Sequence, residues 1–291
     1  MVTFRERVPY SAIVDRPKLS LPNDAKMVVW TIINVEQWDN GGPMPRSVLP
    51  PPMGQPLLPD LPNWAWHEYG MRVGFWRLHE CFQRFNITPT MALNGIVCQS
   101  YPRIAQAGID AGWEFMGHGF IQGPMHRVED QREAIQHTNE AIKNFTGKLP
   151  TGWECPGLTE TDETIDILAD EGIKYVADWV LDDQPVRIAT ENGSMVSVPY
   201  SVETNDIPIF ALQNQASDAM YKRTIDQFER LYAESETVTR VMAISVHPYL
   251  SGVPHRIGYL EKIYEHIQAK PGVLMWTGEQ IYEWYVSHNP N

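Results

Sequence analysis

The chain has 291 residues, of which 43% are apolar and 20% are charged, a composition typical of a globular protein with a sizeable core. Asp and Glu outnumber Lys and Arg by 36 to 23, so the formal net charge is −13. A chain this acidic gives no reason to expect nucleic acid or an anionic membrane as a partner. No apolar run reaches the ~18–20 residues that cross a bilayer. The three cysteines form no CxxC pair, and we therefore predict a cytoplasmic protein.

Short apolar runs alternate with amphipathic segments along most of the chain. The runs are apolar on both faces, as in buried parallel strands, and span 27–34, 88–94, 113–118, 174–178, 195–200, 241–247 and 272–276. Apolar side chains at helical spacing predict helices over 72–85, 131–145, 159–172 and 256–267, with a cap pattern at Thr159 and Asp162. This alternation predicts an α/β fold: a single deformed (β/α) TIM-like barrel of about seven parallel strands, with residues 1–291 as one domain.

Residues 43–62 interrupt this pattern. They contain eight prolines, which are incompatible with a helix, and they follow the first predicted strand. A long loop after a barrel strand usually belongs to the rim of the active site. We predict a rim loop here, with a surface or subunit-contact loop as the alternative.

Polar and aromatic side chains follow the ends of the predicted strands. They are Glu36, Gln37 and Trp38 after the first, His118 after the third, Trp153 and Glu154 after Pro150, Asp178 and Trp179, Tyr200, and finally His247. In such a barrel these positions share one mouth, and two histidines with several carboxylates suit acid–base hydrolysis or metal binding. Each residue also has a structural reading, since a lone histidine often only donates a hydrogen bond and tryptophans often fill a core.

The order of these residues resembles the polysaccharide deacetylase superfamily with its NodB-homology domain. The run 34–37, Asn-Val-Glu-Gln, stands where that family has two adjacent acids, a base and a metal ligand. His118 and Gln122 stand where it has two metal-binding histidines, and His247 matches its catalytic acid. The family's helix signature is present over 69–78, YGMRVGFWRL.

Gln37 and Gln122 are departures from the family, because neutral amides replace two of its three metal ligands. The same loss is typical of a metal-independent branch, the allantoinases and cyclic-imide hydrolases, and the segments YVADWVLDDQP and VPYSVETNDIPIF are similar to that branch as well. The resemblance therefore implies a site without a cofactor. Zinc is the alternative, and in that case His118 and Glu36 are the first candidate ligands.

We predict a hydrolase of non-peptide C–N bonds that opens a small cyclic amide or imide. Glu36 is the predicted base, His118 orients it or binds the carbonyl oxygen, and His247 protonates the leaving nitrogen. The predicted substrate contacts are Gln37, Gln122, Trp38, Trp153, Glu154, Asp178, Trp179 and Tyr200. Two alternatives stay open: a metal-dependent polysaccharide or peptidoglycan N-deacetylase, and a catalytically inactive binding protein. The resemblance also implies a homo-oligomer, with a tetramer as one possibility.

Overall fold

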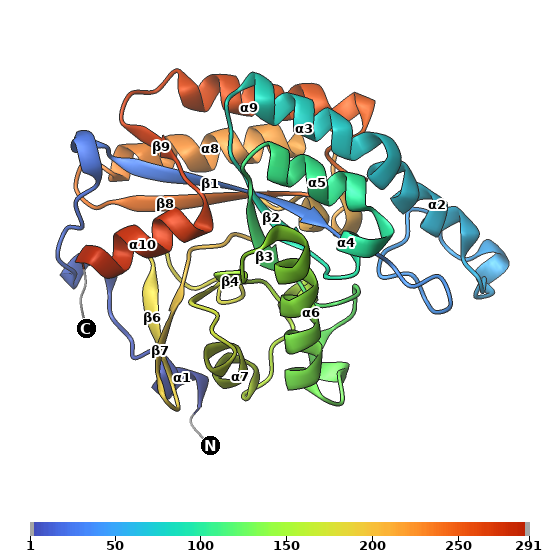
Figure 1. Ribbon diagram of the computed structural model, residues 1–291. Coiled ribbons are helices and arrows are strands. Elements are labelled where there is room, and N and C mark those ends of the chain that lie inside the picture. The colour runs from blue at the N-terminus through green and yellow to red at the C-terminus, as the bar shows by residue number, and fades with distance from the viewer. Residues whose placement is uncertain (1–2, 289–291) are drawn as a thin grey trace.

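A nine-stranded sheet forms the centre of the computed structural model, which describes residues 3–288 (Figure 1). The strand order is β6–β7–β5–β4–β3–β2–β1–β8, with β9 paired to β1. All pairs are parallel except the hairpin of β6 and β7. The strands are β1 (Met27–Val35), β2 (Thr90–Leu93), β3 (Glu114–Gly117), β4 (Gly152–Trp153), β5 (Tyr175–Val176), β6 (Val186–Thr190), β7 (Gly193–Ser197), β8 (Arg240–Val246) and β9 (Val273–Met275).

The sheet curls into a deformed TIM-like barrel. β1 lies between β2 and β8, and the segment after β7 returns to β8 through a single parallel bridge between Asn205 and Ser245. This bridge closes the ring, so the carboxyl ends of β1, β3, β4 and β8 surround one mouth. The predicted α/β fold is confirmed, whereas the assignment of residues 1–291 to one domain stays a prediction.

Helices cover the outside of the barrel, and α3, α5, α8 and α9 lie together beside β1 and β8 (Figure 1). Two π-helical segments, η4 (Gly70–Gly74) and η7 (Ile207–Leu212), and the short helix η5 (Met125–Arg127) lie near strand ends. The α-helices are α1 (Phe4–Arg7), α2 (Leu61–Tyr69), α3 (Phe75–Arg84), α4 (Val97–Ser100), α5 (Pro102–Asp110), α6 (Gln131–Thr146), α7 (Thr164–Asp170), α8 (Ala219–Glu234), α9 (Pro254–Gln268) and α10 (Gly278–His288). No helix in this described part is long and apolar enough to cross a membrane.

The side chains of β1 alternate between two apolar cores. Val29 and Ile33 pack outward against the helices, whereas Trp30 and Ile32 belong to the cluster inside the barrel. Because side chains of a strand alternate between its two faces, the inward series continues to Asn34 and then Glu36 at the mouth. The sequence of β1 thus aims two polar side chains into the barrel.

Three local predictions require correction. The strand β6 was missed; it pairs with β7 across a two-residue turn, Glu191 and Asn192, that is not a typical hairpin dipeptide. Thr159 does not cap α7, which begins at Thr164; its hydroxyl accepts a hydrogen bond from the backbone of Met125 instead. The Pro-rich segment ends inside a helix, because α2 begins at Leu61 and a proline is tolerated in the first helical turn.

Candidate active site

A cavity of about 670 Å³ lies at the carboxyl ends of the strands. Glu36, His118, Glu154 and His247 line it, and each follows a strand: β1, β3, β4 and β8. Gln122, Tyr200 and residues 43–46 of the Pro-rich segment line it as well. This is the end of a barrel at which catalytic side chains collect.

Glu36 is the centre of the hydrogen bonds in the cavity, although only 5% of its surface is exposed. Its Oε1 accepts from the Gln122 amide at 2.9 Å, and its Oε2 accepts from the Trp38 indole at 2.7 Å. The Nε2 atoms of His247 and His118 lie 3.4 and 3.8 Å from the same Oε1. One carboxylate therefore faces four nitrogen atoms.

Each histidine is oriented by its Nδ1 atom. The Nδ1 of His118 lies 2.7 Å from the backbone oxygen of Glu154, and the Nδ1 of His247 lies 2.6 Å from Oδ1 of Asp206. The Asp206 carboxylate also accepts from the His247 backbone at 2.8 Å and from the Ser251 hydroxyl at 2.7 Å. Both rings thus present Nε2 to Glu36 and to the cavity.

Burial and charge together set the protonation states. Burial acts to raise the pKa of the Glu36 carboxyl, but its contacts with His118 and His247 outweigh burial and hold the pKa well below its usual range. Burial acts to lower the pKa of His247, but the charge of Asp206 and the contact with Glu36 raise it to about 10. At neutral pH, Glu36 is a carboxylate and His247 is an imidazolium.

The pKa of Glu154 is shifted in the opposite direction. Its carboxyl group is buried, and burial raises its pKa, an effect that the nearby histidines only partly offset. A protonated carboxyl group can donate a hydrogen bond as well as accept one. The cavity therefore contains one ionised and one more readily protonated carboxyl group.

Glycines of the signature segment let a helix approach the His247 turn. A Cβ atom at Gly70 would lie 2.5 Å from the backbone nitrogen of Tyr249, and one at Gly74 would lie 2.1 Å from the carbonyl oxygen of Pro248. Larger residues would push η4 away from this turn. The two glycines thus help to fix His247 and Tyr249 at the mouth.

Five of the predicted substrate contacts have side chains that do not line the cavity. Gln37 turns its amide oxygen to the Ser100 hydroxyl, and Trp38 lies behind Glu36, stacked on His67 with a centroid distance of 4.4 Å. Trp153 and Asp178 are buried outside the cavity, where they contact Cys155, and Trp179 donates to Glu160. Gln122, Glu154 and Tyr200 line the cavity, and their contact with a substrate stays a prediction.

Other residues were not selected from the sequence. Asp206 orients His247, and Tyr249, Arg46 and Arg127 line the cavity. The sequence did contain a pointer to Asp206, because this residue lies in the segment VPYSVETNDIPIF, which is similar to the metal-independent branch. The two arginines had no such pointer, because neither follows a strand directly.

Five side chains of the cavity carry a buried polar atom that has no hydrogen-bond partner within residues 3–288. Buried polar groups normally have partners, so these atoms are candidates for contacts with a substrate or with water. They are Asn34 Oδ1, Arg46 Nε, His118 Nε2, Glu154 Oε2 and Tyr249 Oη.

The residues do not fit the metal set that the resemblance implies. Gln37 faces Ser100, away from the cavity, and the Gln122 amide uses its NH₂ group as a donor to Glu36. Of the three implied ligands, only His118 offers a free donor atom at the site. The chemistry of this site is therefore derived from its side chains alone.

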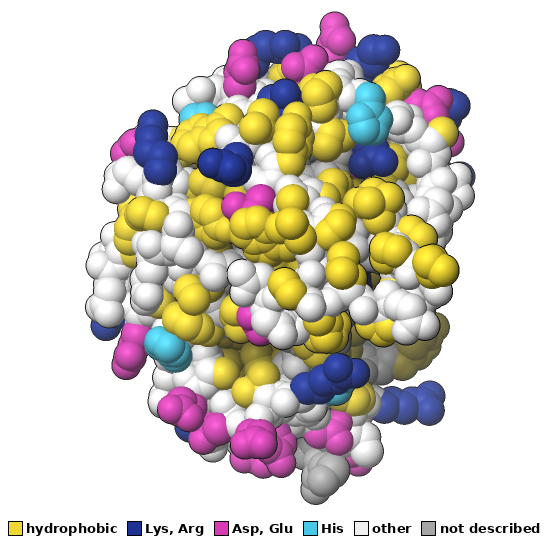
Figure 2. All heavy atoms as spheres, turned by 90° about the vertical axis from the view of Figure 1, so that its right-hand side faces the viewer, with side chains coloured by type: hydrophobic (Ala, Val, Ile, Leu, Met, Phe, Trp, Pro, Cys, Tyr) yellow, Lys and Arg dark blue, Asp and Glu magenta, His cyan; other side chains and the backbone are white. Residues whose placement is uncertain are grey.

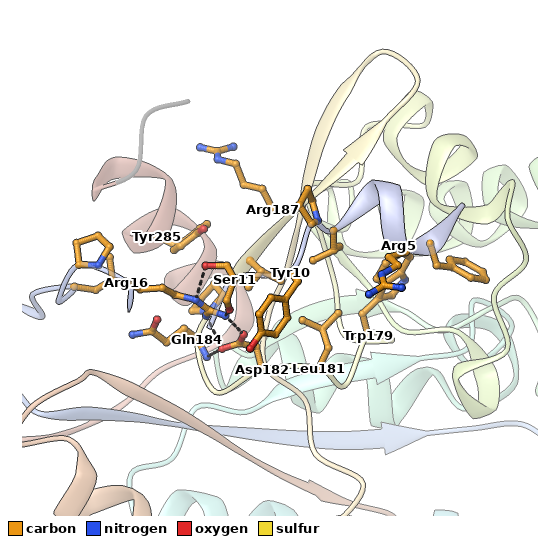
Figure 3. A pocket seen from close by; sticks show the side chains of 17 residues that line it. Arg5, Tyr10, Ser11, Arg16, Trp179, Leu181, Asp182, Gln184, Arg187 and Tyr285 are labelled. Carbon is orange, nitrogen blue, oxygen red and sulfur yellow. Dashed lines mark hydrogen bonds and ion pairs between the residues drawn. The ribbon is translucent and has the colours of Figure 1, made fainter. Parts of the chain in front are cut away.

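A second cavity, of about 690 Å³, lies between the N-terminal segment and β6 (Figure 3). Tyr10, Trp179 and Tyr285 line it, and Arg16 contacts Asp182 there through two hydrogen bonds of 2.9 and 2.6 Å. Its described lining contains no histidine, so it lacks the acid–base pair found at the mouth of the barrel.

Comparison with known proteins identifies the class. Residues 67–176 match the family model described as polysaccharide deacetylase. A putative polysaccharide deacetylase of Schizosaccharomyces pombe is 28% identical over 301 residues, which cover 92% of each chain. A peptidoglycan deacetylase of Helicobacter pylori is 25% identical over 252 residues, and the match covers 75% of this chain and 85% of that protein. The crystal structure of PuuE allantoinase has a TM-score of 0.87 at 23% identity, over 97% of this chain and 99% of that one.

Residues 67–176 therefore match the polysaccharide deacetylase family that the motifs predicted, and the first of these relatives extends the similarity over most of the chain. The deacetylase match and the allantoinase neighbour together indicate a hydrolase of carbon–nitrogen bonds other than peptide bonds.

Proposed function

We propose that this hydrolase opens a small cyclic amide or imide with its own side chains and without a bound metal. The observation that carries the proposal is the surroundings of Glu36, which has His247 at 3.4 Å and the Gln122 amide at 2.9 Å. The base Glu36 and the acid His247 thus lie together. The amide of Gln122, which stands where the deacetylase family has a metal-binding histidine, contacts the same carboxylate. The allantoinase among the structural neighbours supports a ring substrate.

The reaction needs one proton to leave water and one to reach nitrogen. Glu36 takes a proton from water, and the water oxygen bonds to the carbonyl carbon. The C–N bond then breaks, and the leaving nitrogen takes a proton from His247. Glu36 is now protonated and His247 neutral. The pKa of His247 lies above that of Glu36, so the proton returns across the 3.4 Å contact and resets the site.

The buried atoms without partners match the edge of an imide ring. Asn34 Oδ1 accepts, the Tyr249 hydroxyl donates, and a protonated Glu154 or His118 also donates. An imide presents one N–H between two carbonyl groups, so it requires this mixture of an acceptor and donors. The same donors can stabilise the oxyanion that forms when water attacks.

An assay of purified protein before and after treatment with a chelator tests this proposal. We expect turnover of at least one of succinimide, hydantoin, dihydrouracil and allantoin, unchanged by the chelator and without stoichiometric zinc. Turnover that disappears on chelation and returns with zinc contradicts the metal-independent mechanism. No turnover of any ring contradicts the choice of substrate class.

A metal-dependent N-deacetylase is the second candidate. The specific observation in its favour is that His118 Nε2 has no hydrogen-bond partner among the described residues and lies 3.8 Å from Glu36, a histidine and a carboxylate being two of the side chains that bind zinc. The two deacetylase relatives also support it. Zinc-dependent release of acetate from an N-acetylated glycan, with no ring turnover, would favour this candidate over the first.

The proposed enzyme is a homo-oligomer. The Pro-rich segment and the start of α2 expose six large apolar side chains: Val48, Leu49, Met53, Leu57, Leu58 and Leu61. Figure 2 shows apolar side chains spread over the face on the right of Figure 1, where α2 lies. Light scattering should give a mass above the 33.3 kDa of one chain, and a Met53→Glu, Leu58→Glu variant should lower it. A monomeric wild type contradicts this part of the proposal.

A further inference from the structure

Two arginines line the catalytic cavity without an acidic partner. Arg46 belongs to the Pro-rich segment after β1, and Arg127 ends η5, after β3. Neither forms an ion pair within residues 3–288, whereas Arg7 and Arg16 are both paired with aspartates. In a chain with a net charge of −13, these two arginines bring positive charge to the cavity that no acidic side chain pairs within the described residues.

The donors of Arg46 are particularly poorly used. Its Nη1 donates to the carbonyl oxygen of the adjacent Pro45 at 3.0 Å, and its Nε is buried without a partner. A guanidinium offers five N–H donors in a plane that matches a carboxylate. An anion in the cavity would satisfy donors that the described protein atoms leave unused.

The other charges of the cavity do not cancel those of the arginines. Its described lining contains two carboxyl groups, Glu36 and Glu154. Glu36 already faces His118 and His247, and burial of Glu154 favours its neutral form. Arg46 and Arg127 therefore lack a counter-charge among the described residues that line the cavity.

The size of the cavity allows a substituted ring. Its volume of about 670 Å³ lies within the ~300–1,000 Å³ typical of sites for drug-sized ligands. A bare five-membered ring at Glu36 would leave most of this space unfilled.

We propose that the substrate is a cyclic amide or imide that carries a carboxylate or another anionic substituent, which Arg46 and Arg127 bind while the ring lies at Glu36. This inference rests on the proposed ring-opening function and specifies its substrate class. The arginines set the preference between anionic and neutral rings.

The test compares two rings that differ in one carboxylate, hydantoin and hydantoin-5-acetate. We expect kcat/KM to be at least about tenfold higher for the anionic ring, because a hydrogen bond to a charged group contributes enough for a ~10- to 100-fold preference. The preference should fall towards one in the Arg46→Gln, Arg127→Gln variant and survive in Arg127→Lys. Arg230→Gln removes the same charge from an exposed position on α8 and should leave the preference unchanged.

Arg127→Gln alone guards against misfolding, since Arg127 is exposed and its replacement should not disturb the fold. Turnover of hydantoin without a preference for its anionic partner overturns this inference and leaves the proposed function intact. If no ring is hydrolysed, the proposed function fails. Calorimetric binding of succinate and succinamide then decides the inference: the double variant must weaken succinate binding about tenfold and spare succinamide. Equal effects on both ligands overturn it.

Discussion

The pKa values of buried carboxyl groups in this barrel are shifted in opposite directions at two places. Glu36 lies beside His118 and His247, and their contacts overcome burial and keep its pKa well below the usual range. Glu160 and Asp178 have carboxyl oxygens within 4.8 Å of each other, and burial raises the pKa of both. Two buried carboxyl groups this close repel each other when both are ionised, so their proximity favours keeping a proton between them.

The difference shows that burial alone does not define a reactive acid. Burial pushes every carboxyl group towards its neutral form, and only neighbouring positive charge keeps one ionised at neutral pH. The group near Asp178 also brings ligand atoms of Cys155, Glu160 and Asp178 within 4.8 Å of one another. A metal would require these atoms to lose protons that burial retains, so we interpret them as a proton-sharing contact behind the active site.

Replacement of the ionised acid should give the largest effect. Glu36→Gln should lower kcat about 10²- to 10⁴-fold, because an amide cannot take a proton from water. Steady-state kinetics with the best ring measure this change, and the melting temperature checks the fold. Glu261→Gln, a change on the outer helix α9, should leave kcat unchanged. Near-normal turnover in Glu36→Gln would remove Glu36 from the mechanism.

The role of His247 as the acid can be tested with two rings whose nitrogens differ as leaving groups. His247→Ala should slow opening of dihydrouracil by roughly 10²-fold or more and that of succinimide by clearly less. An imide anion is delocalised over two carbonyl groups, so its nitrogen departs more readily without a proton. The comparison applies when wild type turns over both rings. If the variant loses the same factor in rate on both rings, or changes only in KM, His247 is a binding residue and not the acid.

Asp206 should set the pH at which His247 loses its proton and activity falls. His247 must be protonated to act, so activity falls as pH rises through its pKa of about 10. Asp206→Asn removes the charge that raises this pKa, and the alkaline limb should move to lower pH. At pH 9 the variant should lose about tenfold relative to its own rate at pH 7.

The exposed Asp226→Asn on α8 serves as the control for charge. It should keep the wild-type profile. An Asp206→Asn profile with an unshifted limb would show that Asp206 only stabilises the turn.

The sequence predicted the framework of the barrel well because its strands are buried on both faces. The run at β1 is entirely buried, and the helices predicted at 131–145 and 256–267 correspond to α6 and α9. The hairpin strand β6 was missed because its half-exposed residues give no continuous apolar run.

The site was predicted only in part, because following a strand does not fix the direction of a side chain. Trp153 packs in the outer core while the next residue, Glu154, lines the cavity, and Glu36 and Gln37 diverge in the same way. Adjacent residues of an extended chain face opposite sides, so at most one of each pair could reach the substrate. The role of Asp206 depends on the path of residues 198–206, which no local pattern specifies.

The proton-sharing acid should give the smallest effect, on stability rather than on rate. The raised pKa of Asp178 means that the folded state favours its protonated form. Its contribution is therefore full below the unfolded pKa of about 3.9 and is lost as pH rises through the folded pKa. Asp178→Asn keeps an oxygen for the Cys155 backbone and removes the charge, so Tm at pH 8 should rise by about 2–4 °C, which corresponds to ~1 kcal/mol.

Asp166→Asn provides the opposite case. The hydrogen bond from Arg7 holds the pKa of Asp166 below its usual value, so its contribution is present above the unfolded pKa and lost as pH falls. This variant should lower Tm at pH 8 and matter less at pH 4, whereas Asp178→Asn should raise Tm at pH 8 and have little effect at pH 4. Scanning calorimetry at both pH values separates the two. A lower Tm for both variants at pH 8 would mean that Asp178 is ionised in the folded protein and that the two buried groups do not differ as described.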